Sequence, residues 1–372
     1  MSYDVYAELG GKSEQDVGDL IKGQARSQNI SNIAARVRLL AGIAARNEQI
    51  KDYAVSGDRK QGGGYKSLVH ASDGRHTAYA KELIAPALVQ LRKLGLLDGA
   101  PDLQQLPLGS WFLHFIFTLA KPWLSKDDEP FYVAESVNPV RKDKVFKVPL
   151  MSAASWKGLL RWTAMQTRLV ETRAEWNDEQ WTEERLRQTF LFGDEKGEEP
   201  GGAKDFTAHL DKLGGPAARK RYAQKTRDYF FLDEKDALPH HGGRLMFYPT
   251  FFDLIDVEVI NPHSRKTKAG THPIYLECVP AGARAAFSLL YVPFDLIGQD
   301  ADEIRAQAAQ DLATLCEAME ALLLTYGFSA KRTSGYGTAK DEIESGIVRT
   351  RAGEWKLTRL SNLAAEVEHV GF

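Results

Sequence analysis

The chain of 372 residues has an ordinary globular composition, with 43% hydrophobic and 26% charged residues, which excludes a disordered polymer and leaves room for roughly two to three domains. Its formal net charge of −2 excludes a strongly basic protein, so any nucleic-acid surface must come from local clusters of cations. Cys278 and Cys316 are its only cysteines, which excludes a disulfide framework and favours a reducing, cytoplasmic location.

No secretory leader and no membrane span are expected from the sequence. The start of the chain lacks a positively charged segment followed by an apolar one, as a signal peptide would require. The longest apolar run, 111–119, is interrupted by His114 and is far too short to cross a bilayer. We therefore expect no membrane partner.

Residues 1–105 are predicted to form a helical extension, which could be an interaction domain. Apolar residues recur at helical spacing from Ile33 to Ala44 and from Leu83 to Leu94, and Gly95 is a typical helix stop. The tetrapeptide 10–13, GGKS, is not read as a phosphate loop, because no glycine stands at its leading position and no buried strand precedes it.

The run WFLHFIFTLA at 111–120 predicts a fully buried strand after a boundary near residue 105. A polar loop follows it, from Lys121 to Glu135, and contains Asp127 and Asp128.

The stretch from 138 to 163 is the one around which the prediction is organised. A basic linker leads through Pro149 into a helix that Ser152 or Ser155 can cap. A helix start with free N–H groups and with Lys157 and Arg161 one turn in is a place to hold a phosphate. A solvated basic face beside a core helix is an equally good interpretation.

Two further segments are candidates for binding nucleic acid. The run 219–227, RKRYAQKTR, interleaves cations with an aromatic ring, which suits single-stranded nucleic acid but equally suits a surface helix. Residues 261–272 are polar and lie between predicted strands, so we expect an arm that projects from the sheet; an ordinary hairpin loop is the alternative.

The clearest predicted helix, 300–326, carries one apolar stripe and ends at Gly327. The loop 327–340 that follows places Lys331 and Arg332 beside Gly335-Tyr336-Gly337. Glycines allow close approach of the backbone to a ligand, and successive N–H groups in such loops can form an anion-binding nest.

Taken in order, these motifs resemble the RAMP superfamily of type III CRISPR effector subunits. The segment Asn138-Pro139-Val140 followed by SWKGLLR at 155–161 is similar to the strand–loop–helix entry of that family. LFG at 191–193, GRL at 243–245, the arm, and AKRTSGYG at 330–337 then follow in the family's order. The resemblance covers residues 111–342.

The resemblance implies an α+β, ferredoxin-like core with an inserted thumb. It divides the chain into the helical extension 1–105, an RNA-binding core 106–345 with its thumb at 261–272, and a C-terminal segment 346–372. The implied function is antiviral defence, with CRISPR guide RNA, target RNA and other effector subunits as partners. The residues expected to bind RNA are Arg141, Lys144, Ser155, Lys157, Arg161, Arg265, Lys266, Lys268, Lys331, Arg332, Gly335, Tyr336 and Gly337.

Two alternative functions are enzymatic. Part of the family cuts target RNA with an aspartate just before the Asn-Pro-Val segment, where this chain has Val137. A Mg²⁺- or Mn²⁺-dependent endoribonuclease would have to use Asp127, Asp128 or Glu135 instead, whereas RNA binding alone requires no cofactor. A metal hydrolase built on the histidines is the remote alternative, because His240, His241, His263 and His272 do not have metal-ligand spacing.

Overall fold

The computed structural model describes residues 13–25, 28–56, 64–70, 77–97, 99–125, 138–195, 206–233, 235–236, 240–262, 270 and 274–372. At its centre is a five-stranded antiparallel sheet with the strand order β11-β10-β3-β9-β5. Four strands and two helices of this core follow one another as β3 (Trp111–Thr118), α7 (Ala153–Met165), β5 (Leu245–Phe247), β9 (Arg284–Tyr291), α10 (Ala301–Glu320) and β10 (Glu342–Arg349). This β-α-β-β-α-β succession is that of ferredoxin-like folds, so the predicted α+β class is confirmed.

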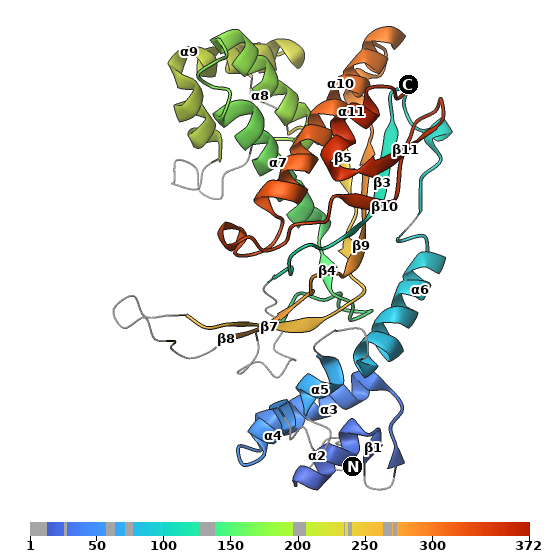
Figure 1. The fold of residues 1–372 in the computed structure, drawn as a ribbon. Helices are drawn as coiled ribbons and strands as arrows, with labels where there is room; N and C mark the ends of the chain where they lie inside the picture. Colours follow the sequence, from blue (N-terminus) through green and yellow to red (C-terminus); the bar gives the residue numbers. More distant parts are fainter. Residues whose placement is uncertain are drawn as a thin grey trace.

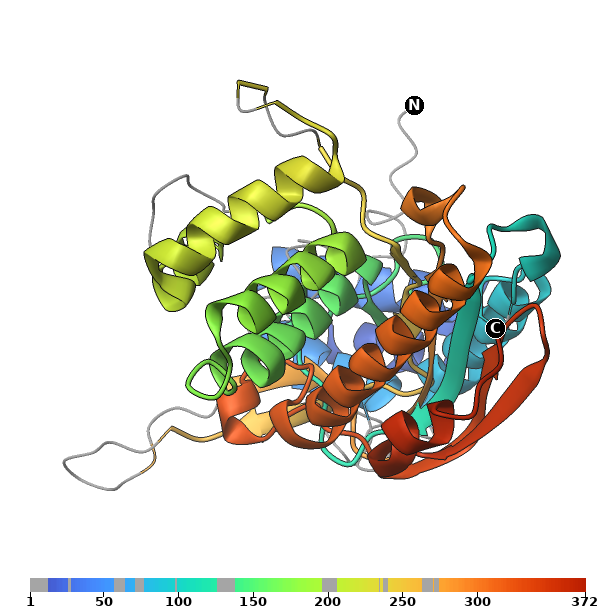
Figure 2. The same ribbon diagram turned by 90° about the horizontal axis from the view of Figure 1, so that it is seen from above.

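Helices α7 and α10 cover one face of the sheet (Figures 1 and 2). The alternate residues Trp111, Leu113 and Phe115 of β3 are fully buried, as expected where a strand faces a helical layer. Trp156 of α7 contacts Phe287 of β9 edge-on, with ring centroids 4.9 Å apart. Aromatic packing of this kind fixes the position of α7 on the sheet.

The sheet continues through the boundary expected at residue 345. β10 spans that position, and β11 (Glu354–Arg359) pairs with it. In α11 (Leu363–Val367) the side chains of Leu363 and Val367 are buried. Residues 346–372 therefore complete the core instead of forming a segment of their own.

A helical insertion lies between α7 and β5. It consists of α8 (Asp178–Phe192) and α9 (Phe206–Tyr229), packed around a small apolar cluster that contains Trp181. The basic run 219–227 lies in α9, where Arg221 and Lys225 form ion pairs with Glu179 of α8. The buried guanidinium of Arg185 lies over the Tyr222 ring, with its Cζ 4.0 Å from the ring centroid. The structure thus favours the surface-helix interpretation of this run.

Two strands, β7 (Asp256–Ile260) and β8 (Ile274–Cys278), form an antiparallel ribbon that projects from the molecule (Figure 1). Ile260 lies opposite Ile274 at its outer end, so the predicted arm 261–272 connects the two strands of a ribbon. Arg265, Lys266 and Lys268 lie outside the described residues. A second small pair, β4 (Leu150–Met151) with β6 (Thr250–Phe251), lies at the start of α7.

The N-terminal region is helical, as predicted, and packs against the core. Its elements are α2 (Glu14–Ile21), β1 (Gln24–Ala25), β2 (Gln28–Asn29), α3 (Ile33–Arg46), α4 (Lys51–Ser56), α5 (Tyr65–Val69) and α6 (Ala85–Lys93). One continuous cluster of buried apolar side chains includes Val17 of α2, Leu40 of α3 and Trp111 of the sheet. Within the described part of the chain, no helix has the length and apolar character that crossing a membrane requires.

A buried carboxylate joins the N-terminal helices to the core. Glu277 of β8 accepts hydrogen bonds from the Tyr65 hydroxyl at 2.7 Å and from the Val140 N–H at 3.1 Å. His70 Nε2 lies 2.8 Å from its Oε1, and the buried Lys142 ammonium forms an ion pair with its Oε2. Burial alone raises the pKa of Glu277, but the charge of Lys142 and the hydrogen bond from His70 outweigh it and hold the pKa below its usual range.

Lys142→Met is expected to lower the free energy of unfolding by about 3–5 kcal/mol, because it leaves a carboxylate buried without its cation. Urea denaturation at pH 7 measures this loss. The control is the double variant Lys142→Met/Glu277→Gln, which removes both charges and should recover much of the loss. A single variant as stable as the wild type would show that the ion pair does not hold the junction.

Acid should weaken the same junction. Because the folded state lowers the pKa of Glu277, its stabilising contribution is complete above the unfolded pKa of about 4.3. That contribution is lost as the pH falls through the folded value. Lys142→Met removes a cause of the lowering, so acid unfolding of this variant, followed by circular dichroism, should begin at higher pH than that of the wild type.

Candidate nucleic-acid interface

The first turn of α7 begins where the chain leaves β4 in extended conformation. Ser152 is the N-cap, and its hydroxyl accepts a hydrogen bond from the N–H of Ser155 at 3.2 Å. The hydroxyls of Ser152 and Ser155 lie 2.8 Å apart. The capping predicted from the sequence is therefore present, with Ser155 exposed on the outer side of the helix.

The loop 327–340 folds back on itself and approaches this first turn. A helical turn, Ala321–Tyr326, continues α10 up to Gly327, whose φ of +74° favours glycine. The N–H of Phe328 donates to the carbonyl of Gly337 at 2.9 Å. A Cβ on Gly337 would lie 2.4 Å from that of Ser329. Gly337 is thus required by close packing inside the loop.

The segment 122–124, just beyond β3, holds the loop in place. The N–H of Gly337 donates to Pro122 O and the N–H of Ala330 to Leu124 O, each at 2.8 Å. Trp123 Nε1 donates to Phe328 O at 3.0 Å. The N–H groups of Ser334 and Gly335 donate to carbonyls of the same loop. These N–H groups are therefore engaged inside the protein, and the anion nest expected from the sequence is not formed by them.

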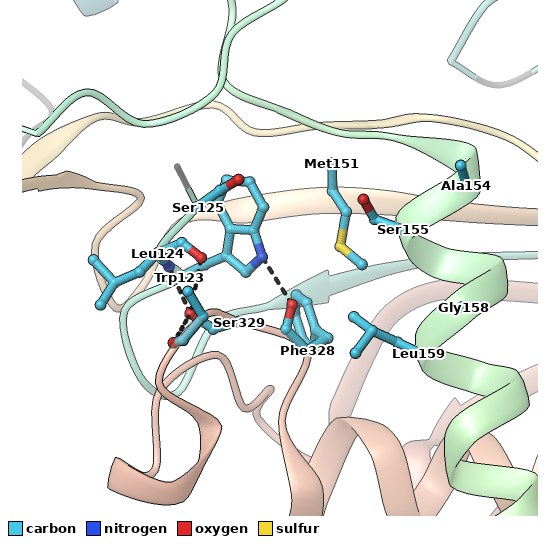
Figure 3. A pocket seen from close by; sticks show the side chains of 11 residues that line it. Trp123, Leu124, Ser125, Met151, Ala154, Ser155, Gly158, Leu159, Phe328 and Ser329 are labelled. Carbon is cyan, nitrogen blue, oxygen red and sulfur yellow. Dashed lines mark hydrogen bonds between the residues drawn. The ribbon is translucent and has the colours of Figure 1, made fainter. Parts of the chain in front are cut away.

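A hollow of about 420 Å³ separates the loop from α7. Figure 3 shows Trp123, Leu124 and Ser125 on one side and the first turns of α7 on the other. Its lining residues are Trp123, Leu124, Ser125, Met151, Ala154, Ser155, Gly158, Leu159, Phe328, Ser329 and Ala330. Hydroxyl groups and apolar side chains thus share its surface.

The four cations expected at this place have different environments. Lys331 is exposed and follows Ala330, which lines the hollow, and Lys157 is half-buried on α7. The guanidinium of Arg332 lies 4.3 Å from the centroid of the Trp162 ring. Arg161 is directed inward and donates to the carbonyls of Asp194 at 2.9 Å and Gly193 at 3.2 Å.

Arg161 is therefore a cross-link between α7 and the segment after α8. Its guanidinium also lies over the Phe206 ring, 4.8 Å from the centroid. Burial lowers the pKa of Arg161 from its ordinary value, although the charges of Glu195 and Asp194 oppose this. Two of the five N–H donors of this guanidinium meet carbonyls, and its Nε is buried, without a partner among the described residues. The guanidinium is thus not presented to a phosphate at the surface.

The other predicted residues are dispersed. Arg141 and Lys144 are exposed in the linker before β4. Tyr336 donates its hydroxyl to Glu258 of β7 at 3.1 Å, which links the loop to the base of the ribbon. Gly335 is exposed on the loop with a φ of +80°. Asp127, Asp128, Glu135 and Val137 lie outside the described residues.

Several residues of the site were not predicted. Trp123, Ser125 and Ser329 carry no recognisable motif, whereas Gly158, a glycine inside a helical pattern, is a signal that could have been used. Among the described residues, no group of three or more His, Cys, Asp or Glu side chains could hold a metal ion. His240 instead lies 3.0 Å from Asp194.

Comparison with solved structures finds chains of CRISPR complexes. A chain described as type III-B Cmr-beta bound to cognate target RNA is 11% identical, with a TM-score of 0.44 over 91% of this chain and 99% of that one. A chain of the Csm3-Csm4 subcomplex of a type III-A interference complex is 16% identical, with a TM-score of 0.33 over 72% and 100%. A chain of a type IV-B CRISPR complex is 12% identical, with a TM-score of 0.36 over 65% and 91%. No family model and no curated protein matches the sequence.

Replacing Gly335 or Gly337 by valine is expected to lower the free energy of unfolding by different amounts. Gly335→Val should lower the free energy of unfolding by about 1–2 kcal/mol, because the left-handed φ is its main constraint. Gly337→Val should cost about 1–3 kcal/mol more, because its side chain overlaps Ser329. Thermal and urea unfolding of both variants measure the difference, and equal losses would contradict it. If the loop approaches RNA, Gly335→Val should also weaken binding beyond its effect on stability.

Proposed function

We propose that this chain is an RNA-binding subunit of a type III CRISPR effector complex and that it binds the guide RNA in antiviral defence. The observation that carries the proposal is the convergence of two motifs of the resemblance. Ser155 and Gly158 of the helix-entry motif and Ala330 of the glycine-loop motif line the same hollow, although more than 150 residues separate them in the sequence. The guide would lie across this face, with target RNA and neighbouring subunits as further partners.

The charge at this face supports binding to a phosphate backbone. Lys331 follows Ala330 of the lining in the loop, and Lys157 precedes Gly158 of the lining in α7. Arg332, the next residue of the loop, lies over the Trp162 ring of the same helix. Cations around a neutral hollow suit sequence-tolerant contact with a single strand. Arg161 is left out of this set because its guanidinium is directed inward, to the carbonyls of Gly193 and Asp194. Cleavage is not part of the proposal, because Val137 stands where the resemblance places the acid.

The test is RNA affinity as a function of salt for the variant Lys157→Gln/Lys331→Gln/Arg332→Gln. Each phosphate contact of a single strand contributes about 0.7 to the slope of log affinity against log salt. Removing three contacts should therefore reduce the slope by about 2, together with the affinity. Fluorescence anisotropy with a labelled guide RNA measures both.

The matched control is Lys22→Gln/Lys93→Gln/Lys356→Gln, which removes the same charge at exposed positions on other elements. It should leave the slope nearly unchanged. Equal slopes for the two triple variants would reject this face as the interface. If the purified wild type carries RNA of defined length, that RNA is the preferred probe.

The ribbon provides a second test of the same proposal. Replacing residues 261–273 by Asn-Gly would join Ile260 to Ile274 in a tight turn compatible with their pairing. We expect unchanged thermal stability and weaker engagement of guide or target RNA. A variant that unfolds would show that the arm is structural, and one that binds both RNAs normally would exclude it from the interface.

A further inference from the structure

The hollow between α7 and the loop 327–340 has the character of a binding site for a neutral, flat group. Apolar side chains of Met151, Leu159 and Phe328 form much of its lining, and hydroxyls of Ser125 and Ser155 lie on its surface (Figure 3). Among the described residues that line it, none is charged. A phosphate inside would meet no counter-charge from these described lining residues, whereas a heterocycle with polar edges would find apolar contacts and hydrogen-bonding partners.

Gly158 makes this hollow possible at a cost to the helix. It is the sixth of the 13 residues of α7, and glycine is among the least favourable residues in a helix interior. A Cβ built on Gly158 meets nothing within 4 Å, and the residue is exposed. No neighbour within the described chain therefore requires glycine here. Because Gly158 has no side chain, only backbone lines the hollow at this position.

Two other glycines, one in the helical insertion and one in the loop, show a contrast. A Cβ on Gly214 would lie 2.4 Å from the Trp181 ring, and one on Gly337 would overlap Ser329. Those two positions need glycine because of contacts inside the chain. A Cβ would also meet nothing at Gly95, Gly215, Gly242, Gly298 and Gly335. Gly158 differs from these in lining the hollow, so the open space there can receive a group from outside.

We propose that the hollow accepts one unpaired nucleobase of the bound RNA, while the adjoining phosphates lie outside it near Lys157 and Lys331. This inference rests on the proposed function and deepens it, since it names the part of the RNA that this site contacts. The commitment to a nucleobase follows from two features. The described lining residues are uncharged, and two of them, Gly158 and Ala330, are next in sequence to Lys157 and Lys331 of the face proposed for the RNA backbone.

The first test is a substitution on α7 whose larger side chain fills the hollow. Gly158→Leu introduces a good helix former whose side chain occupies the space, and Gly158→Ala is the matched control with the same backbone change and little added volume. Loss of one base contact corresponds to a fall in RNA affinity of about 5- to 150-fold, which is expected for Gly158→Leu and not for Gly158→Ala. The salt slope should not change, because no phosphate contact is removed.

A second measurement changes the RNA instead of the protein. Guide RNAs with a single abasic position, moved along the strand, should lose affinity for the wild type at one position. At that position Gly158→Leu should be insensitive, because the two changes remove the same contact. Ala154→Leu, which fills the hollow from the first turn of α7, should repeat the result if Gly158→Leu unfolds.

The outcomes separate this inference from the proposed function. A wild type that binds no RNA overturns both. A wild type that binds RNA with an affinity that neither filling variant nor any abasic position changes overturns the inference alone. If a filling variant keeps RNA affinity but no longer joins a partner subunit, the occupant is a protein side chain and the nucleobase is rejected.

Discussion

The buried carboxylate of Glu277 is the interaction on which the arrangement of the molecule depends. It lies in β8, at the base of the ribbon, and meets Tyr65 and His70 of the N-terminal region and Lys142 of the linker before α7. A charge in such surroundings is stable only when all its partners are in place. Glu277 therefore links the helical extension, the ribbon and the entry to α7, beside the continuous apolar cluster that joins the N-terminal helices to the sheet.

From this junction the position of the candidate interface follows. The linker that carries Lys142 continues into β4 and then into α7, so the start of the helix is set from one side. The loop 327–340 is set from the other, through hydrogen bonds to residues 122–124. Both walls of the hollow thus have fixed positions before a ligand arrives. In a preformed site, less of the binding free energy is lost to ordering the protein when the ligand binds.

Much of the fold could be predicted because its signals are local. The apolar stripe of α10 and the aromatic run of β3 appear in the periodicity of the sequence, and the capping at Ser152 appears in its residue types. The junction could not be predicted, since Glu277 and His70 are 207 residues apart. The same reason explains Arg161: its spacing on α7 predicted a phosphate ligand, but its partner carbonyls belong to a turn 32 and 33 residues away.

Helix α7 shows how one short element can serve both stability and recognition. Trp156 and Leu160 are buried against the sheet, and Arg161 ties the helix to the insertion, so its axis cannot shift easily. Ala154 and Gly158, the smallest residues on its outer turns, face the hollow instead. Large side chains on the inner face thus supply the packing that allows the outer face to remain open. A cavity beside a loosely packed helix would collapse, whereas close packing on the inner face of α7 favours a hollow that keeps its shape, as the proposed base-binding site requires.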